Sequence, residues 1–220
     1  MNKADQITAA AAGKARRLVL FDFDGTLTKG DSFPAFLWFA TPFSSMISGV
    51  FQLLFQLPQF FLLPAEKRAE RAKAVVLSAF IGGKNRTTLL GLGRQFYQQR
   101  LQKMLRTELL ETLRNYRDAG DMVVLVSASI DIWLQPFCDA ERIALICTEL
   151  AYEQEVFKGT FSTPNCNREE KARRIRDAYN LNQYSAVVAY GNSSGDAAMF
   201  ELAQEAWYCS NDGNLKNLRS

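Results

Sequence analysis

Two aspartates, Asp22 and Asp24, stand at the end of an apolar run over residues 18–23, directly before Gly25. The run has the composition of a buried β-strand, in which residues i and i+2 point to the same side. Both carboxylates are therefore predicted to face the same edge of a sheet. An Asp-Gly turn would explain Asp24 but not Asp22, which lies within the apolar run. Because a buried carboxylate needs a cation or hydrogen-bond donors, the pair indicates a polar site at this edge.

The composition restricts the chemistry that such a site can perform. The 220 residues include no histidine, which excludes Ser-His-Asp triads, Cys-His proteases and histidine-ligated metals. Carboxylates, lysines, hydroxyls, backbone N–H groups and hard cations are left. A net charge of +3 is too small to indicate nucleic acid binding. The four cysteines are scattered, as is typical of reduced thiols in a cytoplasmic protein.

The elements that must position the carboxylates alternate between strand and helix, which predicts an α/β fold with a parallel sheet. Strands are expected at 18–23, 122–127, 143–147, 186–190 and 206–209, and helices at 107–117, 167–179 and 194–204. Asn167 is the expected N-cap of the second helix, with Glu170 completing a near capping box. A small hairpin is expected over 152–161, with its turn at Lys158-Gly159.

Residues 32–105 break the alternation and look helical throughout, as a cap inserted after the first strand. The predicted organisation is an N-terminal extension over 1–15, a core domain over 16–31 and 106–220, and a helical cap domain over 32–105. Such a cap would cover the carboxyl edge of the sheet, where ligands of open α/β sheets bind.

The segment "FDFDGTLT" resembles the signature of the haloacid dehalogenase superfamily, whose members are mostly Mg²⁺-dependent phosphatases. Three further matches follow in the family's order: "VLVSAS", which contains Ser127 and Ala128, then Lys171, and then "YGNSSGDAAM", which contains Asn192 and Asp196. The resemblance implies a Rossmann-like core with an inserted α-helical cap of the C1 type. The position of the cap is most similar to the branch that includes phosphoserine phosphatases.

The resemblance also implies a role for each matching residue. Asp22 would be the nucleophile that forms an aspartyl-phosphate, and Asp24 would be the general acid and base. Ser127, Ala128 and Lys171 would bind the phosphate. Mg²⁺ would be held by Asp22, the backbone carbonyl of Asp24, Asn192 and Asp196.

Asn192 departs from the family pattern, which usually has an aspartate at this position. The amide oxygen can still coordinate Mg²⁺, so weaker metal binding is expected rather than none. Three interpretations stay open: a natural variant that works with asparagine, an inactive protein that only binds, and an engineered substitution. Asp196 could compensate by ligating through water or by orienting Lys171.

The cap contains an uncharged stretch from Ser32 to Ala65, followed by the basic segment "EKRAERAK" over 66–73. Pro42, Pro58 and Pro64 interrupt the stretch, and small or polar residues recur at helical spacing on one stripe: Ser45, Ser48, Gly49, Gln52, Gln56 and Gln59. The pattern suits a helix in a membrane interface or a helix packed within the cap. In a membrane interface, the basic residues would meet anionic headgroups; they are Lys67, Arg68, Arg71 and Lys73.

A large aromatic content in the cap favours an interaction surface. The aromatic residues are Phe33, Phe36, Trp38, Phe39, Phe43, Phe51, Phe55, Phe60 and Phe61. Peripheral membrane contact through 33–63 would place the chain at the inner membrane face. Within the family, the apolar cap resembles that of phosphatidylglycerophosphatase-like members more than the shorter polar cap of phosphoserine phosphatases. This resemblance implies a lipid-linked phosphate such as phosphatidylglycerophosphate as the substrate. The alternatives are a soluble phosphatase for a metabolite such as phosphoserine and a catalytically weak phosphate- or lipid-binding module.

Overall fold

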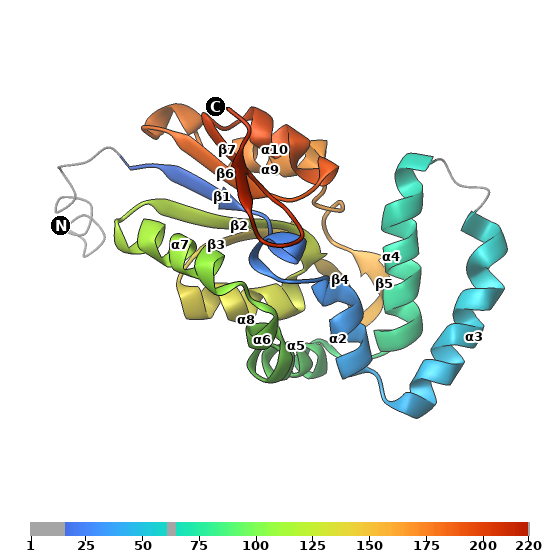
Figure 1. Cartoon of the computed structure of the whole chain (residues 1–220). Helices are drawn as coiled ribbons and strands as arrows, with labels where there is room; N and C mark the ends of the chain where they lie inside the picture. Colours follow the sequence, from blue (N-terminus) through green and yellow to red (C-terminus); the bar gives the residue numbers. More distant parts are fainter. Residues whose placement is uncertain (1–15, 61–64, 220) are drawn as a thin grey trace, which may run out of the picture.

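The computed structural model describes residues 16–60 and 65–219, and within them six strands form one sheet in the order β3-β2-β1-β6-β7-β8 (Figure 1). The strands are β1 (Leu18–Phe21), β2 (Met122–Ile130), β3 (Ala144–Thr148), β6 (Val187–Gly191), β7 (Glu205–Cys209) and β8 (Leu215–Asn217). Neighbouring strands are parallel except for β7 and β8. The predicted α/β fold with a Rossmann-like core is confirmed.

Helices cover both faces of the sheet, and alternate residues of β1 show how. Val19 and Phe21 belong to the apolar cluster that contains residues of α7 (Thr107–Asp118) and α8 (Asp131–Glu141). Leu18 and Leu20 belong to the opposite cluster, with residues of α9 (Glu169–Ala178) and α10 (Ala197–Glu201). All four side chains are fully buried, as expected for a parallel strand covered on both sides.

The order of the strands determines where a ligand can bind. The chain leaves β1 for β2 and β3 on one side and then returns to β6 on the other side of β1. In open α/β sheets, the crevice outside the carboxyl ends of the strands at such a reversal is the usual binding site. Asp22 directly follows β1 at this position.

Helices fill the described part of the predicted cap. They are α2 (Ser32–Ala40), α3 (Phe43–Phe60), α4 (Ala65–Ile81), α5 (Arg86–Phe96) and α6 (Gln102–Met104). Phe36 of α2 stacks on Trp133 of α8, with ring centroids 4.6 Å apart. A Cβ on Gly93 of α5 would lie 1.8 Å from the Ile132 carbonyl oxygen, so α5 and α8 are in close contact. The division into two domains stays a prediction, and residues 1–15 lie outside the described residues.

The helix α3 packs on α4 at the far edge of the cap (Figure 1). On the predicted stripe of small or polar residues, Gly49 is buried against α4, where its Cβ would lie 2.9 Å from the Phe80 ring. Among the described residues, no helix is both long enough and apolar enough to cross a membrane.

The ends of two strands differ from the prediction. The strand β1 stops at Phe21, and Asp24 lies in a tight turn over Phe23–Leu27 with Gly25 at a φ of 78°. Strand alternation is therefore the wrong reason for the proximity of Asp22 and Asp24. The strand β2 continues past Ser127 to Ile130, with an irregularity in its pairing to β3 between these two residues.

Two turn and cap predictions are also wrong. The hairpin of β4 (Leu150–Glu153) and β5 (Val156–Phe161) turns at Gln154 and Glu155, both at positive φ. Gly159 instead lets β5 approach α4, because its Cβ would lie 2.6 Å from Ser78. Helix α9 begins at Glu169 with Arg168 as its N-cap, so Asn167 lies one residue too early.

Candidate active site

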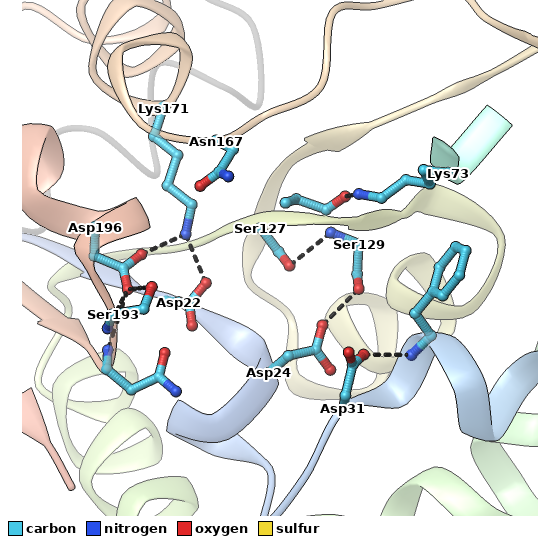
Figure 2. A pocket seen from close by; sticks show the side chains of 13 residues that line it. Asp22, Asp24, Asp31, Lys73, Ser127, Ser129, Asn167, Lys171, Ser193 and Asp196 are labelled. Carbon is cyan, nitrogen blue, oxygen red and sulfur yellow. Dashed lines mark hydrogen bonds and ion pairs between the residues drawn. The ribbon is translucent and has the colours of Figure 1, made fainter. Parts of the chain in front are cut away.

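A cavity of about 260 Å³ opens at the carboxyl ends of the central strands. The structure brings all seven predicted site residues to its wall: Asp22, Asp24, Ser127, Ala128, Lys171, Asn192 and Asp196. Figure 2 shows that they come from separate parts of the chain, since Lys171 extends from α9 while Asp22 and Asp24 follow β1. Their individual roles stay predictions, but the required proximity exists.

Lys171 links Asp22 and Asp196 at the base of the cavity. Its Nζ donates to Asp22 Oδ1 and to Asp196 Oδ1, each at 2.6 Å, and its side chain is 2% exposed. Burial alone would lower the pKa of Lys171, but the two carboxylates outweigh it and raise the pKa. The lysine is therefore a permanent positive charge beside Asp22.

Asp22 is nearly buried, and its second oxygen accepts the Thr26 hydroxyl at 3.0 Å. Burial raises the pKa of Asp22 to about 6, against the lowering effect of Lys171. The lysine and the threonine hold the carboxylate in a fixed orientation, as an attacking group requires.

Asp196 accepts hydrogen bonds from the surrounding loop as well as from Lys171. Its Oδ2 accepts the N–H groups of Asn192 and Ser193 and the Ser193 hydroxyl, at 3.0–3.1 Å. With Ser193 as N-cap, this is a capping box for the short helical turn before α10. Both oxygens are engaged by donors, so the geometry favours Asp196 as the residue that orients Lys171 and the Asn192 loop.

Asp24 occupies the cap side of the cavity. Its Oδ1 accepts the Ser32 N–H at 2.6 Å, and its Oδ2 accepts the Ser129 hydroxyl at 2.5 Å. Burial raises the pKa of Asp24, although both hydrogen bonds oppose the rise. A carboxyl group that retains its proton more readily than usual is suited to act as a general acid.

Ser127 and Ala128 form the wall next to Asp24. The Ser127 Oγ accepts the Ser129 N–H at 3.0 Å. None of the described residues accepts the Ser127 hydroxyl proton, which can therefore be donated to a phosphate oxygen. The Ala128 carbonyl faces Lys73 and Thr148, so this residue could meet a ligand only through its backbone N–H.

Asn192 lies against Gly25. A Cβ at Gly25 would be 2.0 Å from the Asn192 Nδ2, and the positive φ of Gly25 also disfavours a larger residue. The glycine therefore makes space for the amide at the edge of the cavity. This contact explains in physical terms why "DG" follows the strand.

Six residues of the cavity wall were not predicted from the sequence: Asp31, Phe33, Lys73, Ser129, Asn167 and Ser193. Lys73 comes from α4, and its Nζ donates to the Ala128 carbonyl at 2.6 Å and to Asn165 Oδ1 at 2.8 Å. Burial lowers its pKa. Its assignment to membrane headgroups is wrong, because it points into the cavity (Figure 2). Nothing in the sequence distinguishes Lys73 from its basic neighbours.

The charges around the cavity fit a divalent cation. Asp22, Asp24, Asp31 and Asp196 face Lys73 and Lys171, which leaves a net charge of −2 when all six groups are ionised. No three His, Cys, Asp or Glu side chains of the described residues are grouped as a metal site. The predicted set differs from such a group because it relies on an amide and a backbone carbonyl, and these hard oxygen donors suit Mg²⁺.

Comparison with known proteins agrees with this geometry. Residues 19–201 match the family model of haloacid dehalogenase-like hydrolases. The chain belongs to this family. Protein CicA of Caulobacter vibrioides is 32% identical over 194 residues, which cover 87% of this chain and 85% of that protein. The predicted superfamily is thereby confirmed.

Solved structures show the same fold. A protein of unknown function from Bordetella pertussis Tohama I has a TM-score of 0.69 and 22% identity, with 88% of this chain and 89% of that chain covered. A phosphoserine phosphatase in its apo form has a TM-score of 0.59 and 16% identity, with 87% and 84% covered. At these identities, the likeness shows that both structures share the architecture of this chain.

Proposed function

We propose that the chain is a Mg²⁺-dependent phosphomonoester hydrolase that acts through an aspartyl-phosphate on Asp22. The observation that carries the proposal is the arrangement of two carboxyl groups with different partners in one cavity. Asp22 is oriented by Lys171, whereas Asp24 is held by Ser129 and Ser32 and has a raised pKa. Two carboxyl groups in different environments can take the separate roles of nucleophile and acid.

In the first step, a carboxylate oxygen of Asp22 attacks phosphorus while the bond from phosphorus to the ester oxygen breaks. Asp24 gives its proton to the departing oxygen, so the alcohol leaves neutral. In the second step, Asp24 takes a proton from water, and the water oxygen attacks the phosphorus of the aspartyl-phosphate. Inorganic phosphate leaves, and both aspartates return to their starting states. Lys171 and the Ser127 hydroxyl orient the phosphate oxygens.

The residues that would hold the metal are Asp22, the Asp24 carbonyl and Asn192, with Asp196 supporting them through Lys171 and the loop. When bound, Mg²⁺ would neutralise charge on the phosphate and polarise its oxygens. Without such a cation, a cavity of net negative charge would repel a phosphate dianion.

The exposed face of the cap supports a lipid-linked phosphate, such as phosphatidylglycerophosphate, as the substrate and the inner membrane face as the place of action. Trp38 and Phe43 are 71% and 76% exposed, and Phe51 is 64% exposed. Phe36, in contrast, is buried. The side chains of Phe55, Phe60 and Phe61 lie outside the described residues.

A soluble metabolite phosphatase is the second candidate. The cavity is small and most of the residues that line it are polar, with Asp31 and Lys73 available to bind charged groups of a compact substrate. The weak binding module, in contrast, depends only on the missing charge at Asn192.

A substrate panel tests these proposals. Turnover of an aryl phosphate with Mg²⁺, and its loss with a chelator, would support an enzyme. No turnover would instead favour the catalytically weak binding module. The panel would then compare phospholipid phosphates in detergent micelles with phosphoamino acids. Faster hydrolysis of the phosphoamino acids would overturn the lipid proposal.

A further inference from the structure

A second cavity of about 540 Å³ lies in the cap and shares no residue with the active-site cavity. It is lined by Ala35, Trp38, Phe39, Phe96, Arg100, Lys103 and Met104. One wall comes from α2, and the other comes from the end of α5, the segment that follows it and α6, which lie next to α2 in Figure 1. The side of α2 that carries Phe33 faces the active site instead.

The wall of this second cavity combines aromatic surface with positive charge. Trp38, Phe39 and Phe96 supply the aromatic part, whereas Arg100 and Lys103 are exposed. Neither cation forms an ion pair with a described residue, and no carboxylate lines the cavity. The local sequence has the same bias, since residues 85–107 contain five Arg or Lys and no Asp or Glu. A ligand that matches this wall therefore carries a negative charge next to an apolar group.

An apolar strip on α3 follows the aromatic wall along the chain. Trp38 lies near the end of α2 and Phe43 begins α3, and both are mostly exposed. Ile47, Val50 and Phe51 extend the strip along α3, with exposures of 52%, 49% and 64%. Their helical positions turn them away from Gly49, which packs on α4. Side chains of this kind can enter the interface of a bilayer.

We infer that the second cavity binds the headgroup of an anionic phospholipid, while Trp38, Phe43 and the apolar strip of α3 enter the bilayer surface around it. Charge complementarity favours a bilayer, because uncompensated cations at the edge of an aromatic surface match phosphate groups above acyl chains. The site is separate from the catalytic cavity and does not depend on the chemical nature of the substrate. Its effect would be to hold the cap at the membrane in one orientation.

Co-sedimentation with vesicles tests the inference on the full chain. We expect much stronger binding to vesicles of phosphatidylcholine with one third phosphatidylglycerol than to pure phosphatidylcholine. In the double variant Arg100→Gln, Lys103→Gln, binding should fall roughly 30-fold, since each basic residue near an anionic surface contributes roughly fivefold. The control Lys158→Gln, Lys216→Gln removes the same charge at two other exposed sites and should have little effect.

A second comparison tests the aromatic residues. The double variant Trp38→Gln, Phe43→Gln is compared with the control Leu215→Gln, Leu218→Gln, whose side chains are also exposed. Only the first pair should lose binding to the anionic vesicles. Each variant should keep its melting temperature and its rate on an aryl phosphate, which separates this inference from the proposed catalysis.

Three results would overturn the inference. The first is a wild type that binds neither vesicle, or binds both equally. The second is an equal loss in the Arg100, Lys103 variant and its charge control. The third is a wild-type dimer that becomes monomeric in the Trp38, Phe43 variant, because the same face would then be an interface between copies of the chain.

Discussion

The contact between Gly25 and Asn192 allows a sharp test of the active-site geometry. In Gly25→Ala, the new Cβ would lie 2.0 Å from the Asn192 Nδ2, so the amide must swing away. The substitution also places alanine at a φ of 78°, which costs about 1–2 kcal/mol. Gly83→Ala is a matched control, since Gly83 has the same φ and its Cβ would meet nothing within 4 Å.

Both variants should therefore lose a few degrees in melting temperature, because 1 kcal/mol corresponds to about 2–4 °C in a chain of this size. Only Gly25→Ala should lose activity on an aryl phosphate, on the order of 100-fold, as a displacement of about 1 Å can cost this much. It should also need more Mg²⁺ for half-maximal rate.

Adding Asn192→Gly to Gly25→Ala tests whether the clash is the cause. If Gly25→Ala loses more stability than Gly83→Ala, the double variant should recover the difference. Equal activity in the two alanine variants, or no recovery of an extra loss of stability, would refute the proposed role of this contact.

Three further predictions concern charge. Lys171→Met leaves Asp22 and Asp196 without their shared cation, which should lower the free energy of unfolding by about 3–5 kcal/mol at neutral pH. The loss should be smaller at low pH, where the carboxylates take up protons. An unchanged melting temperature would contradict this prediction. Burial raises the pKa of Asp131 to about 6, so the folded state binds its proton more tightly than the unfolded chain, and stability should fall as the pH rises from about 4 to about 6. Asp131→Asn should then stabilise by roughly 1–3 kcal/mol at neutral pH but not near pH 4, and equal melting shifts at both pH values would exclude this titration. Asn192→Asp should lower the Mg²⁺ concentration for half-maximal rate about tenfold, or 1.4 kcal/mol, and no change would place residue 192 away from the metal.

The sequence predicted the parts of the site that depend on local pattern. The apolar runs indicated the central strands, and residues that follow parallel strands must meet at one edge of the sheet. Only Asp22 and Asp24 were assigned to a site from this pattern alone. Ser127, Lys171 and Asn192 were assigned to the same site through their resemblance to the motifs of the family.

Other parts of the site depend on packing between distant segments, which leaves no local signal. Lys73 lies in a basic run of the cap, and only the packing of α4 directs it to Ala128 rather than to solvent. Ser129 reaches Asp24 because β2 continues past Ser127. The pair Asp22 and Asp24 was predicted for the wrong reason, since the turn at Gly25 and not the strand places Asp24.

The hairpin shows the same limitation at the level of the backbone. Lys158-Gly159 has the composition of a turn, yet Gly159 is needed for the close approach of β5 to Ser78. The actual turn uses Gln154 and Glu155, two residues without a turn preference. The tertiary contact has outweighed the local propensity.

The central claim is that Asp22 itself carries the phosphoryl group during turnover. The most direct measurement is rapid acid quenching of the enzyme with Mg²⁺ and an aryl phosphate, followed by mass spectrometry of its peptides. We expect the peptide that contains Asp22 to gain the mass of one phosphoryl group, with the modification on that side chain. Asp22→Asn should show neither the added mass nor turnover. A phosphoryl group on another residue, or turnover that persists in Asp22→Asn, would contradict the account.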